Sequence, residues 1–262
     1  MTIIRCSLLL AFVLVLQNCA EKAPELTRPL NSELIPTDAK PIPSNVYKVN
    51  CWVEQEKFNA VGVCTNTSAG WQKIWLEAAP LNAAGKPISI SKCSSVFLAT
   101  FSDAVPPNGR TSFFFSWPLA DFSEKPDSFS IKSVVASPKP SGPILVVPFS
   151  NGLQMFSQSV PGQPSMEGWH VSGSLSNPLE MESLHPRLEV LVYGTDRRLW
   201  LSTVLNPEEP NARQIYQTEV EGPLKPGEER PFRLQVYYQA LPKPLQDQKI
   251  GNVEILPFEA RM

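Results

Sequence analysis

Proline punctuates this sequence along its whole length, with 27 prolines among 262 residues, about twice the average share in globular proteins. Proline lacks the backbone N–H that a helix interior needs, and in sheets it is confined to edges, strand ends and bulges. The stretches between the prolines are short and rich in β-branched and aromatic residues. This pattern favours short strands joined by turns over long helices.

The runs from Tyr47 onward have the spacing of an antiparallel sandwich. "VYKVNCWVEQ" and "FNAVGVCTNTS" form a predicted hairpin, and "WQKIWLEAAP", "SSVFLATFS", "TSFFFSWPL" and "SFSIKSVVAS" follow. Turn residues separate them, as in "LNAAGK" and "PPNGR". Short strands at intervals of roughly 8 to 12 residues are typical of such a fold.

The second half repeats the first in order. Gly173 and Asn177 each lie 111 positions after Gly62 and Asn66, and "KPGEERPFRL" parallels "PPNGRTSFFF" at a slightly larger offset. Self-similarity of this kind indicates tandem copies of one module. We therefore predict an all-β chain with two tandem immunoglobulin-like antiparallel β-sandwich domains. The predicted boundaries are 1–18 for a signal peptide, 19–45 for a disordered tether, 46–137 for the first sandwich, 138–143 for a linker and 144–262 for the second.

"VSGSLSNPLEMESLHPRLEVLVYGTDRRLW" followed by "LKPGEERPFRLQV" resembles the small immunoglobulin-like modules of bacterial envelope proteins known as FxLYD-type domains. The resemblance implies a fold and a surface location, and it implies no catalytic residues. The residues that carry it are Gly173, Asn177, Tyr193, Pro226, Gly227, Glu228 and Phe232, with Gly62, Asn66, Gly85 and Gly109 in the first half.

The N-terminus predicts export and a lipid anchor. Arg5 precedes an apolar run of the length of a signal-peptide core, which is short for a membrane-spanning helix. The run ends at Leu16-Gln17-Asn18-Cys19, which resembles a bacterial lipobox with Asn18 in place of the usual small residue. Cleavage after Ala20 and a buried core cysteine are the alternatives. We expect Cys19 to be acylated, with palmitate as one of its chains, and to anchor the protein in the bilayer of the bacterial cell envelope, at the outer rather than the inner membrane.

Residues 20–45 contain five prolines and no aromatic residue. Such a segment buries too little apolar surface to fold alone, so it is predicted to be a disordered tether.

Three further cysteines, Cys51, Cys64 and Cys93, are disulfide candidates because exported chains tend to oxidise well-placed pairs. Cys51 and Cys64 face each other if the first hairpin turns at Lys57-Phe58, which puts this pair slightly ahead. Cys64 also aligns with Leu175, so the alternative is a buried apolar residue.

The sequence predicts no catalytic residue, no metal site and no cofactor. His170 and His185 are the only histidines, and they are interpreted as surface or strand-end residues. The net charge of −2 gives no basic face for nucleic acid. In "FFFSW", Phe113, Phe115 and Trp117 share one face of a strand and Phe114 takes the other.

Phe114, Tyr237 and Tyr238 are therefore candidates for a partner surface, with a contact between the two domains as the alternative. The favoured function is a non-enzymatic, membrane-anchored lipoprotein that interacts with an envelope protein or cell-wall partner. The alternatives are a surface adhesin-like protein and, more remotely, a solute-binding protein or enzyme.

Overall fold

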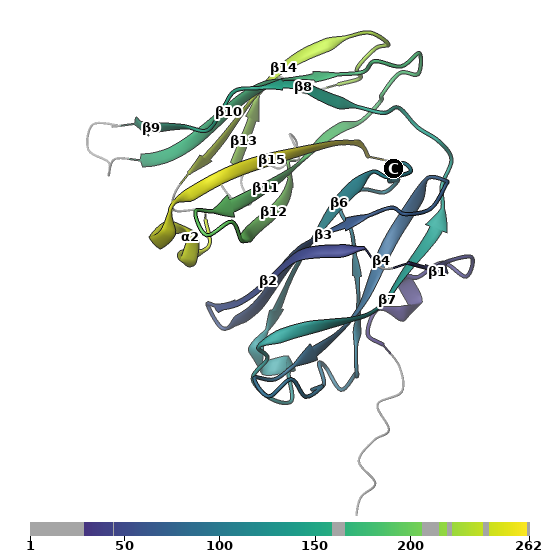
Figure 1. The fold of residues 1–262 in the computed structure, drawn as a ribbon, viewed down its shortest axis with the longest axis vertical. Helices are drawn as coiled ribbons and strands as arrows, with labels where there is room; N and C mark the ends of the chain where they lie inside the picture. The colour runs from purple at the N-terminus through teal and green to yellow at the C-terminus, as the bar shows by residue number, and fades with distance from the viewer. Residues whose placement is uncertain are drawn as a thin grey trace, which may run out of the picture.

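The computed structural model describes residues 29–43, 45–158, 166–205, 215–218, 222–237 and 241–260. This part of the chain is nearly all β and forms two antiparallel β-sandwiches (Figure 1). The predicted fold class is confirmed. None of the described helices is long and apolar enough to span a membrane.

The first sandwich consists of two sheets that close over one apolar core. One sheet has the order β2–β3–β6, and the other has the order β1–β7–β4–β5. Two 3₁₀ turns, η1 (Ser32–Leu34) and η2 (Leu119–Asp121), accompany them. The strands are β1 (Lys40–Ile42), β2 (Val46–Glu54), β3 (Lys57–Thr65), β4 (Gln72–Leu81), β5 (Val96–Ala99), β6 (Arg110–Pro118) and β7 (Ser128–Pro138).

The second sandwich has the same two-sheet plan. One sheet has the order β13–β14–β10–β8, with β9 also paired to β10, and the other has the order β12–β11–β15. A short helix, α2 (Lys243–Gln248), precedes the last strand. The strands are β8 (Val146–Ser150), β9 (Gln154–Gln158), β10 (Met166–Ser176), β11 (Pro186–Gly194), β12 (Leu199–Leu205), β13 (Ile215–Thr218), β14 (Glu229–Tyr237) and β15 (Ile250–Glu259).

Two strands, β3 and β11, are buried on both faces. In β3, Ala60 and Cys64 belong to the core of the first sandwich, whereas Val61 and Val63 belong to the apolar cluster of the second. Strands covered on both sides read as continuous apolar runs rather than alternating ones. The sheets β2–β3–β6 and β12–β11–β15 therefore pack face to face in the middle of the molecule (Figure 1).

The segment before the first sandwich is partly folded onto it. Leu30 donates its N–H to the Ser95 carbonyl at 2.8 Å, and its own carbonyl accepts the N–H of Phe97 at 3.0 Å. Strand β1 then pairs with β7. The prediction of a disordered tether over 19–45 is wrong for 29–43, because backbone pairing with β5 and β7 compensates for the low apolar content. Residues 1–28 and 44 lie outside the described part.

The repeat identified in the sequence includes two equivalent asparagines that make the same kind of hydrogen bonds in the two sandwiches. The buried side chain of Asn66 donates to the carbonyls of Gly70 and Val105, both at 2.8 Å. Asn177 donates in the same way to Met181 at 2.7 Å and to Leu224 at 3.1 Å. Each asparagine thereby ties the end of one strand to two loops, satisfying carbonyls that would otherwise be buried without a partner.

Candidate functional site

The contact between the two sandwiches is the most distinctive feature of the molecule, and its apolar part centres on Trp52. The Trp52 ring lies 5.4 Å from that of Trp200 in an edge-on arrangement and 6.1 Å from that of Phe114. Asn50 adds a hydrogen bond from its side-chain amide to the Leu199 carbonyl at 2.9 Å. Aromatic pairs at such distances stabilise beyond their buried area, so the sandwiches are held together by a packed aromatic contact.

A buried carboxylate lies in the same contact. Glu189 of β11 is 1% exposed and reaches across to β6 of the first sandwich. One of its oxygens accepts the Thr111 hydroxyl at 2.8 Å, and the other accepts the N–H and hydroxyl of Ser112 at 2.8 and 2.6 Å. The Ser112 hydroxyl also hydrogen-bonds that of Ser202 on β12. Three donors from one sandwich therefore satisfy a carboxyl group of the other.

Burial raises the pKa of Glu189 to about 7, although hydrogen bonds from Ser112 and Thr111 and the charge of Lys73 oppose the shift. Desolvation penalises the ionised form more than these neighbours stabilise it. The contact therefore contains a group whose charge changes near neutral pH.

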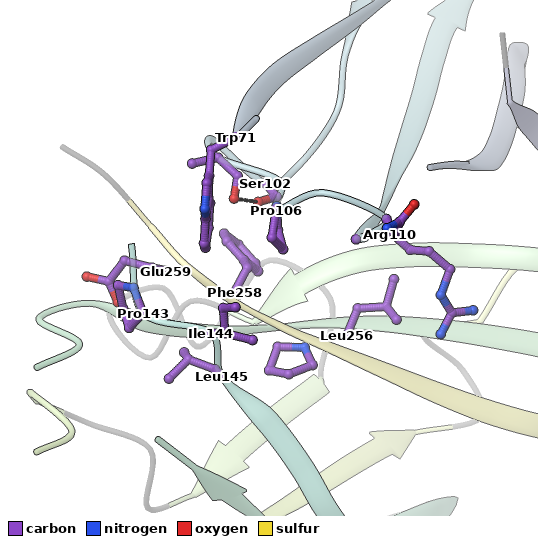
Figure 2. Close-up of a pocket in the computed structure, with 14 residues that line it drawn as sticks. Trp71, Ser102, Pro106, Arg110, Pro143, Ile144, Leu145, Leu256, Phe258 and Glu259 are labelled. Carbon is purple, nitrogen blue, oxygen red and sulfur yellow. Dashed lines mark hydrogen bonds between the residues drawn. The ribbon is translucent and has the colours of Figure 1, made fainter. Parts of the chain in front are cut away.

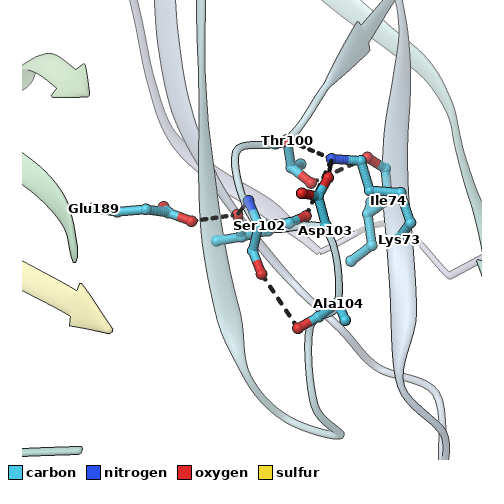
Figure 3. A network of polar contacts seen from close by, with 8 residues as sticks. Lys73, Ile74, Thr100, Ser102, Asp103, Ala104 and Glu189 are labelled. Carbon is cyan, nitrogen blue, oxygen red and sulfur yellow. Dashed lines mark hydrogen bonds and ion pairs between the residues drawn. The ribbon is translucent and has the colours of Figure 1, made fainter. Parts of the chain in front are cut away.

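The polar network continues into the first sandwich, as Figure 3 shows. Thr111 accepts the N–H of Ser102 at 3.1 Å. The Lys73 ammonium group donates to the carbonyls of Thr100 and Ser102 at 2.8 and 3.2 Å and to Asp103 at 2.8 Å. The network therefore joins the loop after β5 to the contact between the sandwiches.

A hollow of about 250 Å³ lies beside this network, where the linker enters the second sandwich (Figure 2). We call it the junction hollow. Ile144, on its rim, is 43% exposed. The Glu259 carboxylate accepts the backbone N–H groups of Leu184 and His185, both at 3.0 Å, and so holds a loop of its own sandwich. The lining of the junction hollow is mainly apolar and includes Trp71, Pro106, Pro143, Ile144, Leu145, Leu256 and Phe258.

A second hollow, of about 610 Å³, lies on the seam between the sandwiches, and we call it the cation hollow. Lys48 of β2 reaches it from the first sandwich, and the turn between β11 and β12 closes it from the second. It is lined by Lys48, Tyr193, Gly194, Thr195, Arg197, Gly251 and Asn252.

The predicted disulfide pairing is contradicted. The first hairpin turns at Gln55 and Glu56, which both have positive φ, so Cys51 faces Ala60 and Cys64 faces Val46. The expected turn at Lys57-Phe58 is two residues too late. All three cysteines of the described chain, Cys93 included, are free thiols.

Burial raises the pKa of Cys51 to about 11 and that of Cys64 to about 12. Cys64 and its aligned partner Leu175 are both fully buried. The alternative prediction of a buried apolar residue is therefore confirmed for Cys64.

Of the residues predicted to form a partner surface or carry a lipid, the structure describes the surroundings of Phe114 most fully. Phe114 packs against the second sandwich beside Trp52, so it belongs to the contact between domains rather than to an open partner surface. Tyr237 ends β14 opposite Gly168. Cys19 and Tyr238 lie outside the described residues.

The two histidines lie apart from the contact between the sandwiches. His170 shares a 2.7 Å hydrogen bond with Gln154. Burial and the charge of Arg233 lower its pKa. His185 makes backbone hydrogen bonds near the end of β15: its N–H donates to the Glu259 carboxylate, and its carbonyl accepts the N–H of Ala260. Within the residues described, no cluster of three His, Cys, Asp or Glu side chains could hold a metal ion.

Sequence reasoning missed Glu189 and both hollows. One signal for Glu189 was present, namely a single charge inside the apolar run "LEVLVY". A charged residue in a doubly buried strand requires partners on the facing sheet. The hollows left no such signal, because their walls come from distant parts of the chain.

Comparison with known proteins identifies no family. No family model and no curated protein matches the sequence. Among the solved structures, the crystal structure of red sea bream transglutaminase matches at 13% sequence identity with a TM-score of 0.20. The match covers 73% of this chain and 27% of that one, so the chain spans about a quarter of the transglutaminase. A likeness this weak carries no argument about function.

Proposed function

We propose that this protein is a non-enzymatic envelope lipoprotein, held at a bilayer by acylated Cys19, that serves as an interaction or scaffolding element. The anchor part rests on the sequence, where an apolar run meets Leu16-Gln17-Asn18-Cys19. The scaffolding part rests on the contact between the two sandwiches.

That contact is the observation that carries the proposal. Two sandwiches joined only by a flexible linker sample many orientations, which would have to be restricted when a partner binds. Here Trp52, Trp200 and Glu189 bind one sheet to the other. Loops and sheet edges of both sandwiches therefore face a partner in one fixed arrangement, which lowers the entropic cost of binding.

The folded N-terminal segment limits how far the two sandwiches can lie from a membrane. Among the described residues, Leu30 is the first that pairs with the sandwich, and it lies eleven residues after Cys19. A fully extended chain covers at most about 3.6 Å per residue, so the reach from the anchor is about 40 Å. The proposed partner therefore lies close to the anchoring membrane.

Replacing Cys19 by alanine is expected to move the protein from the membrane fraction to the soluble fraction and to abolish incorporation of labelled palmitate. The physical reason is that each buried acyl methylene contributes about 0.8 kcal/mol to anchoring. Cys6→Ala is the matched control, because Cys6 lies within the apolar run, and it should leave labelling unchanged. Equal labelling of Cys19→Ala and the unmodified protein would refute the anchor.

Cross-linking in intact cells tests the scaffolding part. We expect a discrete envelope protein to be captured by the unmodified chain and to be lost when Ile144→Asp places a charge on the rim of the junction hollow. A charge on an apolar contact surface weakens association, because the group must be desolvated on binding. Val49, 40% exposed on β2, provides the control Val49→Asp. Capture that is unaffected by Ile144→Asp, or equally affected by both variants, contradicts a partner at this hollow.

A further inference from the structure

We propose that the cation hollow binds a phosphate monoester carried by a larger molecule, a phosphorylated sugar or lipid headgroup. The hollow lies on the seam between the sandwiches, with Lys48 on one side and Arg197 on the other. Its volume of about 610 Å³ lies within the usual range for ligand pockets, about 300–1,000 Å³. Inorganic phosphate alone would fill a small part of it.

Lys48 is directed into the hollow by an irregular backbone. The pairing of β2 with β3 shifts register between Tyr47 and Asn50, and Lys48 there has a φ of 54°. Its ammonium group lies 4.6 Å from the centre of the Tyr193 ring and donates to the Tyr193 hydroxyl at 3.1 Å. The Lys48 side chain nevertheless remains 42% exposed, and an ammonium group has further donors to offer.

Arg197 approaches from the turn between β11 and β12 and is uncommitted. The Arg197 N–H donates to the Gly194 carbonyl at 3.0 Å and closes the turn, and Arg197 itself has a φ of 64°. Within the residues described, its guanidinium makes no ion pair. The neighbouring Asp196 is engaged by Arg198, through the backbone N–H at 3.0 Å and an ion pair at 3.8 Å. The charge of Arg197 is therefore available to a ligand.

The charges around the hollow have the sign and size that a phosphate monoester needs. Glu254 is shared by Arg110 at 2.5 Å and Lys48 at 3.7 Å and also accepts the Tyr193 hydroxyl at 2.9 Å. Arg110 lies outside the hollow and balances the charge of Glu254, as Arg198 balances that of Asp196. The charged residues that line the hollow are Lys48 and Arg197, and both are cations. The whole chain carries −2. A phosphate monoester carries about −1.5 to −2 at neutral pH.

Two glycines, Gly194 and Gly251, are among the residues that line the hollow. A Cβ on Gly251 would lie 2.5 Å from the Gly194 carbonyl oxygen, and a Cβ on Gly194 would lie 2.7 Å from Asp196. Only glycine allows this close approach of β15 to the turn. Glycine also lets a ligand come near the main chain.

Isothermal titration of the full chain in detergent tests the proposal with three probes: glucose 6-phosphate, dihexanoyl phosphatidic acid below its micelle concentration, and glucuronate. We expect one of the two phosphates to bind, which identifies the sugar or the lipid as the source, and glucuronate to bind at least tenfold more weakly. Arg197→Asn should weaken phosphate binding at least tenfold. Asparagine tolerates the positive φ of this position, so the turn is preserved.

Arg198→Asn is the matched control, because it removes the same charge one residue away. Arg198 is 68% exposed and pairs with Asp196, so this variant should bind phosphate within twofold of the unmodified chain. Equal losses in the two variants, equal affinity for glucuronate, or no binding of either phosphate would overturn the proposal. The titration does not depend on Cys19, so its failure would leave the anchoring experiment unaffected.

Discussion

Replacing Trp52 by alanine is expected to lower the free energy of unfolding by about 3–5 kcal/mol, the usual cost of removing a buried tryptophan. Trp52 is only 9% exposed and packs against Trp200 and Phe114. The variant leaves a cavity between the two middle sheets. Urea unfolding followed by circular dichroism measures the change.

Val53→Ala is the control for this experiment. Val53 follows Trp52 on the same strand but is 42% exposed, and exposed substitutions usually change stability by about 0.5 kcal/mol or less. If Trp52→Ala were no more destabilising than Val53→Ala, the face-to-face packing of the two sandwiches would be wrong. Because the same contact carries the proposed scaffolding role, that outcome would remove its physical basis as well.

Glu189→Gln is expected to remove a pH dependence of stability that the unmodified protein shows between about pH 4.5 and pH 7. Burial raises the pKa of Glu189 from its usual 4.5 to about 7, so within this window the folded chain holds a proton that the unfolded chain has released. Stability therefore falls as the pH rises through the window. At about 1.4 kcal/mol per unit, the loss is about 3 kcal/mol.

Glutamine has nearly the shape of the protonated acid and never ionises. The Glu189→Gln variant should match the unmodified protein near pH 4.5 and exceed it in stability at pH 8. Thermal unfolding at a series of pH values measures both curves. A decline between pH 4.5 and 7 that persists unchanged in Glu189→Gln would assign it to another group.

The first hairpin illustrates where sequence reasoning reached its limit. Strand identity followed from apolar and β-branched residues, and β2 and β3 do pair as predicted. The predicted turn lies two residues too late, because positive φ is usually signalled by glycine or asparagine and this turn is made by Gln55 and Glu56 instead. A shift of two residues in the turn moves every cross-strand partner, so the predicted Cys51–Cys64 pair was lost with it.

The folded segment at 29–43 illustrates a second limit. Its composition predicted disorder, since proline and polar residues supply little apolar area. The backbone groups of β1 nevertheless complete the edge of β7. Hydrogen bonds between backbones depend on which strand edge is open, and no side-chain pattern reports that.

The sequence by itself determined that the chain is all-β, that its two halves repeat, and that Asn66 and Asn177 occupy equivalent positions, because strand periodicity and turn chemistry are local properties. Only the tertiary structure decided that the two sandwiches pack face to face, that Phe114 and Glu189 lie in that contact, and that Lys48 and Arg197 meet across a hollow. Those relations join residues about 75 to 150 positions apart. They arise from the surfaces that two finished sheets present to each other, and neither surface exists before its sheet has formed.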